Sequence, residues 1–265
     1  MAAAAAKLTT ATLATTFKAL HKPGNPLLLA NVYDLLSAET IASLPSSHAL
    51  ATASFAVARA NGVTDDELSF ETNLAAVQAI SKVTHKHGKP LTVDFQDGYG
   101  SKLTEAVGEL IATAGVVGVN LEDYSREKKG FYSVGEAAGR IKSVLGVARE
   151  KGVADFVVNA RCDVLMHGGE LEEVITRGKT YLEAGATSVF VLGGAGRAVS
   201  QQDIERLVGA FDGRLNVALR IGAPGALTVE DLSRIGVARI SVGPQIQFAA
   251  VNAITDAAKK LLEGK

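Results

Sequence analysis

Eight short apolar runs, separated by longer stretches, constrain the fold of this 265-residue chain more than any other feature. Each run is continuous, often β-branched, and bounded by glycine or polar residues, which predicts a buried parallel strand. The expected strands are Pro26–Val32, His48–Ser54, Pro90–Asp94, Val116–Leu121, Ala154–Arg161, Thr187–Leu192, Leu215–Arg220 and Ala238–Val242. Eight such strands alternating with helices over about 250 residues predict an α/β fold, the (β/α)8 TIM barrel.

The stretches between the runs have helical spacing of apolar residues. The expected helices are Glu71–His85, Leu103–Ala114, Val134–Glu150, Glu170–Ala184, Gln201–Phe211, Thr228–Ile235 and Gln245–Leu262. Before the first strand, Leu8, Leu13, Phe17 and Leu20 predict an N-terminal capping helix. With 47% hydrophobic residues the chain can bury one large core, so we expect a single barrel domain over residues 1–265.

An open doubly wound sheet is the alternative fold. It normally carries a glycine-rich turn after an early strand. The first strand here ends in Asn31-Val-Tyr-Asp34, which contains no glycine, so the barrel is favoured.

Net charge and cysteine content restrict the classes of binding partner and the cellular compartment that we expect for this chain. The net charge is −1, so no basic surplus points to a nucleic acid partner, and no apolar run approaches the roughly 20 residues that span a membrane. The single cysteine, Cys162, excludes an internal disulfide and suggests a reducing compartment. We therefore expect a cytoplasmic protein. A mitochondrial location is the alternative, because no acidic residue precedes Asp34, although transit peptides are usually arginine-rich and no arginine precedes Arg59.

The expected active site lies where the strands end, because barrel enzymes place their chemistry at the C-terminal ends of the strands. Asp94, Glu122 and Arg161 are at or next to such ends, and Asp65 lies in the loop after the second strand. Clustered carboxylates repel one another, and a hard divalent cation such as Mg²⁺ relieves that repulsion. A neighbouring arginine binds a substrate carboxylate through two hydrogen bonds. Metal and arginine together suit an α-keto acid or its enolate.

Several of these residues also have a structural interpretation. Glu122 and Arg161 could form a structural salt bridge. Asp97 and Asp123 are expected to be loop caps or surface acids rather than metal ligands, and Asp34 to be a helix N-cap. No lysine ends a strand, so a Schiff-base aldolase lacks its nucleophile. No histidine is assigned to catalysis.

Segments along nearly the whole chain resemble the isocitrate lyase/phosphoenolpyruvate mutase superfamily, particularly its shorter members. They include Asn31-Val-Tyr-Asp-Leu-Leu-Ser-Ala38, Gly62-Val-Thr-Asp65, Val93-Asp94 with Gly98-Tyr-Gly100, Gly118-Val-Asn-Leu-Glu-Asp123, and Asn159-Ala-Arg161. The resemblance implies that Asp94 is the direct Mg²⁺ ligand. Asp65 and Glu122 match acids that hold the metal's waters, and Gln96 stands where the superfamily has a third such acid.

The resemblance also implies how a substrate is held. The backbone amides of Ser54 and Phe55 match those that bind the substrate carboxylate, and Arg161 matches a catalytic arginine that also binds substrate. Tyr33, at the end of the first strand, is expected to line the substrate site. Tyr33, Tyr99 and Tyr124 are candidate proton-transfer groups.

The implied function is a Mg²⁺-dependent, lyase-like enzyme that acts on a small 2-oxo or 2-hydroxy carboxylate through an enolate, breaking a C–C or P–C bond. The alternatives are a carboxylate-binding barrel without turnover and a hydrolase that uses the same metal site. Two features depart from the pattern besides Gln96: the loop Tyr124–Tyr132 lacks the cysteine of the lyases, and the sixth strand, ending in Leu192-Gly-Gly194, lacks the histidine of the mutases. Superfamily members are commonly oligomers, so a homodimer or homotetramer is expected, with Gln245–Leu262 available for exchange between subunits.

Overall fold

The computed structural model describes residues 8–194 and 197–264. Nine parallel strand segments form one sheet in the order β1-β11-β10-β9-β8-β5-β4-β3-β2. Their bounds are β1 Leu27–Leu29, β2 Asn31–Val32, β3 Leu50–Thr52, β4 Leu91–Asp94, β5 Gly118–Glu122, β8 Val157–Cys162, β9 Ser188–Val191, β10 Leu215–Ala218 and β11 Arg239–Ser241. β1 and β2 are two halves of the first predicted strand, interrupted at Ala30. β1 pairs with β11 and β2 pairs with β3, so the sheet closes into the predicted barrel.

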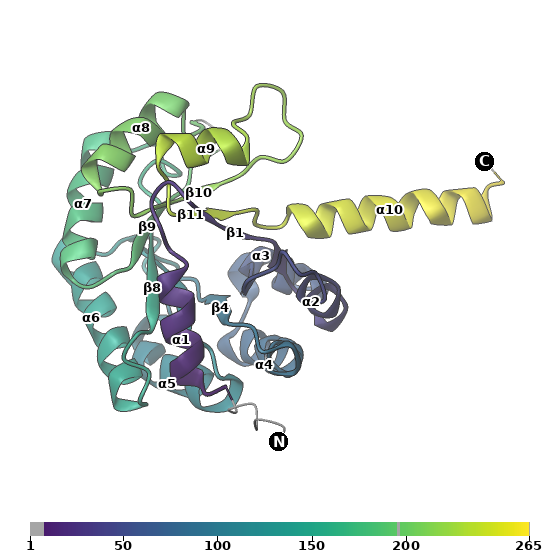
Figure 1. The fold of residues 1–265 in the computed structure, drawn as a ribbon, viewed down its shortest axis with the longest axis horizontal. Coiled ribbons are helices and arrows are strands. Elements are labelled where there is room, and N and C mark those ends of the chain that lie inside the picture. The colour runs from purple at the N-terminus through teal and green to yellow at the C-terminus, as the bar shows by residue number, and fades with distance from the viewer. Residues whose placement is uncertain (1–7, 195–196, 265) are drawn as a thin grey trace, which may run out of the picture.

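The helices surround this barrel (Figure 1). Their bounds are α1 Thr10–Ala19, α2 Leu35–Ala42, α3 Ser54–Ala60, α4 Phe70–His87, α5 Leu103–Ala114, α6 Val134–Glu150, α7 Leu171–Glu183, α8 Gln201–Ala210, α9 Val229–Ile235 and α10 Gln245–Leu262. Each predicted helix is present with small shifts at its ends, and α2 and α3 are additional. The prediction for Asp34 is confirmed, because its Oδ1 accepts the Ser37 N–H at 2.7 Å and caps α2.

Several strands are shorter than their apolar runs. β10 ends at Ala218, so Arg220 lies in the following loop, and β3 ends at Thr52, so Ser54 opens α3 instead of closing a strand. After β5 the chain forms a small antiparallel hairpin from β6 (Tyr124–Ser125) and β7 (Gly130–Phe131). This hairpin stands beside the C-terminal end of β5, where the sequence predicts the active site.

The helix α1 closes the N-terminal end of the barrel, as predicted. Leu13 and Phe17 of α1 are buried, and the Phe17 ring lies 5.9 Å from the guanidinium carbon of Arg239 inside the barrel. A Cβ on Gly118 would come within 2.8 Å of the Val157 carbonyl oxygen and 3.1 Å of the Phe17 ring. A glycine is therefore required where α1 packs against β5.

The helix α10 differs from the other helices because it leaves the barrel and projects away from it (Figure 1). Within α10 only Gln247 is buried, whereas Phe248, Val251, Ile254 and Leu261 are exposed. Among the described residues, no helix has both the length and the apolar composition needed to cross a bilayer.

Candidate active site

Five side chains meet at the C-terminal ends of β4, β5 and β8, and we call them the inner cluster: Asp65, Asp94, Glu122, Arg126 and Arg161. The strand register brings them together, because Asp94 pairs with Asn120 and Glu122 pairs with Arg161. Side chains alternate across a strand, so Glu122 and Arg161 point to the same side of the sheet.

Asp94 is the last residue of β4 and is only 8% exposed. Its Oδ2 accepts the Ser54 N–H at 3.0 Å, and its own N–H donates to Thr52 Oγ1 at 2.9 Å. Its Oδ1 is buried and has no hydrogen-bond partner among the residues that the structure describes. Because a buried carboxylate oxygen is costly to leave unpaired, this atom marks a place where a ligand is expected.

Glu122 and Arg161 form an ion pair, with Nη1 of Arg161 2.8 Å from Oε1 of Glu122, although the pair lacks the alignment of a hydrogen bond. The Nε of Arg161 also donates to Asp163 Oδ1 at 2.7 Å. Burial raises the pKa of Glu122, and Arg161 opposes that rise. Burial lowers the pKa of Arg161, but the charges of Asp163 and Glu122 raise it by a larger amount. The net pKa lies well above the usual value for arginine, so Arg161 stays charged. The salt bridge considered as an alternative therefore exists, and it forms within the inner cluster.

Asp65 is brought to Gln96 and to an arginine to which the sequence analysis assigned no role. The Nε2 of Gln96 donates to the Asp65 carbonyl oxygen at 2.7 Å and to its Oδ1 at 3.2 Å. Arg126, in the hairpin loop, places Nη2 2.9 Å from Asp65 Oδ2 and Nε 3.6 Å from Glu122 Oε2. The sequence feature that could have identified Arg126 is its position. It lies four residues after Glu122, in a loop that follows a strand whose end contributes to the active site.

The predicted substrate-binding residues are placed differently from one another. The Ser54 amide lies in the site, where it is bonded to Asp94. The Phe55 ring is 41% exposed and packs 6.1 Å from the ring of Phe248 in α10, so only its backbone amide remains as a candidate contact. Tyr33 is partly buried, and burial followed by the charge of Asp34 raises its pKa. Its role at the substrate site stays a prediction.

The other two tyrosines considered for proton transfer have structural partners. The Tyr99 hydroxyl accepts from Asn73 Nδ2 at 2.8 Å, and its ring packs edge-on against Phe70 and Phe95. Tyr124 stacks on His167 with ring centroids 4.0 Å apart. These contacts hold Tyr99 in the core and Tyr124 at the base of the hairpin.

A second group, of two acids, two tyrosines and one arginine, lies on the opposite side of the same strands, and we call it the outer cluster: Asp97, Asp123, Tyr132, Arg177 and Tyr181. Asp97 and Asp123 were expected to be loop caps or surface acids, and the surface alternative is excluded because both are buried. Asp97 does cap a turn, since its Oδ1 accepts the Tyr99 N–H at 3.1 Å. Asp123 instead faces α7, where its Oδ2 accepts the Tyr181 hydroxyl at 2.7 Å.

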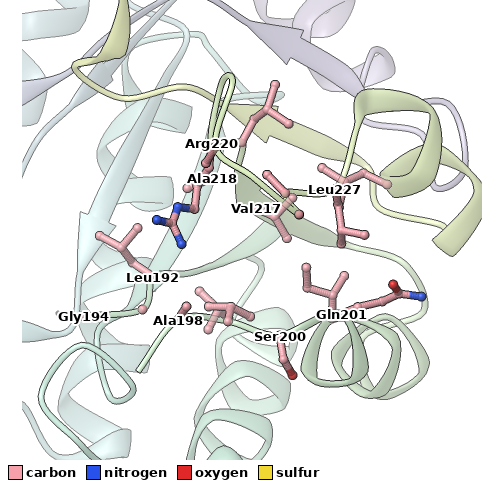
Figure 2. Close-up of a pocket in the computed structure, with 18 of the residues that line it drawn as sticks. Leu192, Gly194, Ala198, Ser200, Gln201, Val217, Ala218, Arg220 and Leu227 are labelled. Carbon is pink, nitrogen blue, oxygen red and sulfur yellow. The ribbon is translucent and has the colours of Figure 1, made fainter. Parts of the chain in front are cut away.

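Two cavities lie at this end of the barrel. One of about 10 Å³ is lined by Glu122, Arg161 and residues of the outer cluster, and it has room for about one water molecule. The other, about 620 Å³, lies under the loops after β9 and β10 and beside α8 (Figure 2). Its described lining is mostly apolar, as with Val217 and Leu227, and Arg220 is its single charged residue. No residue of the inner cluster lines it, so its apolar walls are separate from the predicted carboxylate site.

The inner cluster fits a divalent metal in its donor chemistry. Its carboxylate oxygens are the hard ligands that Mg²⁺ prefers, and Oδ1 of Asp94 is free to serve as a direct ligand. The acids are not gathered around one point, however, because Arg126 holds Asp65 and Arg161 holds Glu122. Accordingly, no three acidic, histidine or cysteine side chains among the described residues form a ready metal-binding group.

The fold and site define a (β/α)8 protein with a buried carboxylate–arginine site at its strand ends. Residues 17–262 match the phosphoenolpyruvate phosphomutase family, and the chain belongs to that family, within the isocitrate lyase/phosphoenolpyruvate mutase superfamily. The predicted resemblance and the prediction of an enzyme of this lyase and mutase superfamily are thereby confirmed. The evolutionary assignment supports a lyase-like enzyme acting on small carboxylates.

Individual relatives agree with this assignment. A phosphoenolpyruvate phosphomutase of Streptomyces viridochromogenes is 28% identical, over 91% of this chain and 77% of its own length. An oxaloacetate decarboxylase of Pseudomonas putida is 27% identical, over 91% of this chain and 81% of its own. A crystal structure from Burkholderia cenocepacia, provisionally assigned as a phosphonomutase, is 32% identical with a TM-score of 0.82, covering 97% of this chain and all of that one.

Proposed function

We propose that this protein is a Mg²⁺-dependent lyase that cleaves a bond next to the carbonyl or hydroxyl carbon of a small 2-oxo or 2-hydroxy carboxylate. The observation that carries the proposal is the buried, unpartnered Oδ1 of Asp94 in the same cluster as the Arg161 guanidinium. The Asp94 carboxylate is a suitable ligand for a cation, and the Arg161 guanidinium is suited to bind an organic anion. The family relationship supports the same chemistry. We retain the expectation of a cytoplasmic location as part of this proposal.

The residues that would hold the metal are Asp94 directly, and Asp65 and Glu122 through water. Gln96 replaces an acid of the superfamily pattern with a neutral amide, so the binding is expected to be weaker than with a full set of acids. When bound, Mg²⁺ would stabilise the negative charge of an enolate oxygen. Gln96 Nε2 donates to the Asp65 carbonyl oxygen at 2.7 Å and to Asp65 Oδ1 at 3.2 Å. These two hydrogen bonds hold Asp65 beside the other acids of the inner cluster.

The substrate carboxylate would be bound by Arg161 and by the amides of Ser54 and Phe55, which open helix α3. The N-cap residue Ala53 gives α3 no side-chain hydrogen bond, but the Ser54 N–H already donates to Asp94 Oδ2 at 3.0 Å, so a substrate carboxylate would share or replace that bond. The pair Arg161–Asp163, at 2.7 Å, fixes the guanidinium in position before substrate arrives. This arrangement would fix the acid group and leave the reacting carbons towards Asp94.

With a substrate such as oxaloacetate, the C3–C4 bond breaks, its electron pair stays on C3 as the enolate of pyruvate, and the C4 carboxylate leaves as CO₂. The enolate then takes one proton at C3 to give pyruvate. Of the three candidate tyrosines, Tyr33 remains as the candidate donor, because the Tyr99 hydroxyl is bonded to Asn73 and Tyr124 stacks on His167. A thiol in this role has no support, because Cys162 is buried in the core and burial raises its pKa well above the usual range.

The second candidate function is a barrel that binds a carboxylate metabolite without turnover. The Gln96 substitution favours it, because it removes one negative charge from the metal-binding set, and the loop Tyr124–Tyr132 has no cysteine. A hydrolase acting through the same site is a third outcome of the test below.

The test is to incubate the protein with Mg²⁺ and oxaloacetate, 2-methylisocitrate-like and malate-like acids, and to measure the release of pyruvate, glyoxylate, oxalate and acetate. We expect pyruvate or glyoxylate release that is lost in Asp94→Ala and Arg161→Ala. Oxalate with acetate would identify the hydrolase instead. Saturable binding of an acid without any product would support the binding barrel and contradict the lyase.

For assembly, we propose a homo-oligomer in which α10 packs on a second copy of the chain. Its exposed Phe248, Val251, Ile254 and Leu261 form an apolar surface that the barrel of the same chain does not cover. Exposed apolar surface of this kind typically marks an interface. Light scattering after size-exclusion chromatography is expected to give a dimer or tetramer that dissociates on Ile254→Glu.

A further inference from the structure

Arg126 lies among the carboxylates that the proposed metal site needs. Its Nη2 is 2.9 Å from Asp65 Oδ2, its Nη1 donates to the Asp65 carbonyl oxygen at 2.8 Å, and its Nε is 3.6 Å from Glu122 Oε2. Burial lowers the pKa of Arg126, but the charges of Glu122, Asp65 and Asp94 raise it by more, so all three acids lie within electrostatic reach of one guanidinium. Arg126 therefore faces the acids assigned to the metal.

The two arginines neutralise part of the negative charge of the inner cluster. Asp65, Asp94 and Glu122, together with Asp163 beside Arg161, carry at most four negative charges, and Arg126 and Arg161 carry two positive charges. Without Arg126, the three acids would face only Arg161, and like-charge repulsion would be relieved by a cation or by protonation. Arg126 thus supplies part of the compensation that a bound divalent ion would otherwise give.

We propose that Arg126 is an internal counter-ion that occupies the acidic side of the site in the metal-free protein, and that binding of a divalent cation displaces it from Asp65 and Glu122. This inference rests on the proposed function, since it concerns the same metal site. It adds a competitor within the chain, which lowers the affinity for the ion and couples metal binding to the position of the β6–β7 hairpin.

The surroundings of Arg126 allow this displacement. Its Nε has no hydrogen-bond partner among the described residues, so its contacts in the cluster are incomplete. Its Nη1 also lies 3.0 Å from Oδ1 of Asp66, whose side chain is 93% exposed. A guanidinium released from Asp65 can keep Asp66 as its partner while it turns towards solvent, which avoids leaving a buried charge unpaired.

The hairpin that carries Arg126 is small enough to move. Its two strands have two residues each, and Lys129 at its turn has a left-handed φ of 49°. By contrast, its base is fixed, because Tyr124 stacks on His167 and packs against Phe131 with centroids 5.3 Å apart. Movement is therefore expected at residues 126–129 rather than in the strands.

The test is calorimetric titration of the substrate-free protein with MgCl₂ alone. A competitor that must be displaced weakens apparent affinity by the free energy of its own contacts, so Arg126→Gln is expected to bind Mg²⁺ roughly tenfold more tightly than the wild type. Thermal unfolding gives a second readout: the variant should gain more in midpoint temperature from added Mg²⁺ than the wild type gains. Neither measurement depends on turnover.

The matched control is Lys128→Gln, which removes the same charge two residues away. Lys128 pairs with Glu136 of α6 at 3.3 Å and has no contact in the inner cluster. We expect its Mg²⁺ affinity to stay within about twofold of the wild type, because exposed charges act weakly through solvent. Adding Asp94→Asn to the Arg126→Gln variant should abolish the binding and so locate the ion.

Each outcome is decisive. Equal affinity in wild type and Arg126→Gln would overturn the counter-ion role and leave the metal site standing. An equal gain in Lys128→Gln would also overturn it, because the effect would then be one of overall charge. Failure of both wild type and Arg126→Gln to bind Mg²⁺ would overturn this inference together with the metal in the proposed function.

Discussion

The inner and outer clusters are built from neighbouring residues of the same strands, yet their hydrogen bonding differs. In the outer cluster every carboxylate oxygen has a donor: Asp123 accepts from the Asp163 N–H at 3.0 Å and from Tyr181, and Asp97 accepts from the Tyr99 N–H and from the Tyr132 hydroxyl at 3.0 Å. In the inner cluster, no described residue donates to Asp94 Oδ1, and Glu122 Oε1 has only a poorly aligned ion contact.

This difference teaches that burial of an acid does not by itself indicate function. Glu122 and Asp123 are adjacent and equally buried, but strand alternation sends one to the barrel interior and the other to the helices. The outer cluster joins β5 to α7, and none of its five side chains has a buried polar atom without a partner among the described residues, as a structural network should. The inner cluster has buried carboxylate oxygens that no described donor satisfies. These free acceptors distinguish a ligand-binding site from a structural hydrogen-bond network.

The largest effect is expected for Asp94→Asn, which should abolish turnover and leave the fold intact. Losing a metal contact worth several kcal/mol in the transition state corresponds to about a thousandfold in kcat/KM. The stability should change by less than about 1 kcal/mol, because the asparagine oxygen can still accept the Ser54 N–H. Product assays together with urea unfolding check both parts. A large loss of stability would place Asp94 with the structural acids and remove the contrast between the clusters.

For Asp123 in the outer cluster we expect the opposite result, a large loss of stability with little change in turnover. Asp123→Ala should destabilise the fold by about 3 kcal/mol, because it leaves the Tyr181 hydroxyl and the Asp163 N–H buried without their acceptor and removes the 3.5 Å ion contact with Arg177. Turnover per folded molecule should stay near that of the wild type. Equilibrium urea unfolding measures the first quantity, and activity corrected for the folded fraction measures the second. If activity fell while stability held, Asp123 would belong to the reaction rather than to the support.

The sequence predicted the barrel and the position of the inner cluster because both depend on strand pattern. A run such as Val116–Leu121 reveals a buried strand, and the residue that follows it must lie at the strand's C-terminal end. The role of Arg126 could not be predicted, because its contacts with Asp65 depend on how two loops, after β3 and β5, fold towards each other. The outer cluster was missed because Asp97 and Asp123 follow strands, where a sequence alone shows no helix packing over them.

The third effect tests whether incomplete hydrogen bonding always marks function. His21 lies at the opposite end of the barrel, with Nδ1 2.9 Å from the Phe17 carbonyl oxygen and Nε2 buried without a described partner. Burial, and then the charge of Arg239, lower its pKa from 6.5 to about 3. The ring is therefore neutral in the folded protein, and one hydrogen bond is enough for it.

A lowered pKa in the folded state gives a defined sign. The folded protein is favoured above pH 6.5, and this contribution is lost as the pH falls towards 3, because the unfolded state takes up the proton first. Between pH 8 and pH 4.5 the wild type should lose about 2.7 kcal/mol more stability than His21→Gln, because the unfolded state is protonated over the two pH units below 6.5. Urea unfolding of both proteins at the two pH values measures this difference. Equal losses would show that the ring is already charged or exposed in the folded state.

The smallest effect discriminates between two forms of the outer cluster. Tyr181→Phe removes the hydroxyl that donates to Asp123, whereas Tyr99→Phe removes one that accepts from the neutral amide of Asn73. A hydrogen bond to a charged group contributes about 1.5–3 kcal/mol and a neutral one about 1 kcal/mol, so Tyr181→Phe should cost more at pH 7. Burial raises the pKa of Asp123, however, so the excess should shrink as the pH falls and the carboxyl takes up its proton. Equal costs at pH 7 would mean that Asp123 is already neutral, and Glu173, 2.8 Å from Arg177 Nε, would then be the charged partner of Arg177 in place of Asp123.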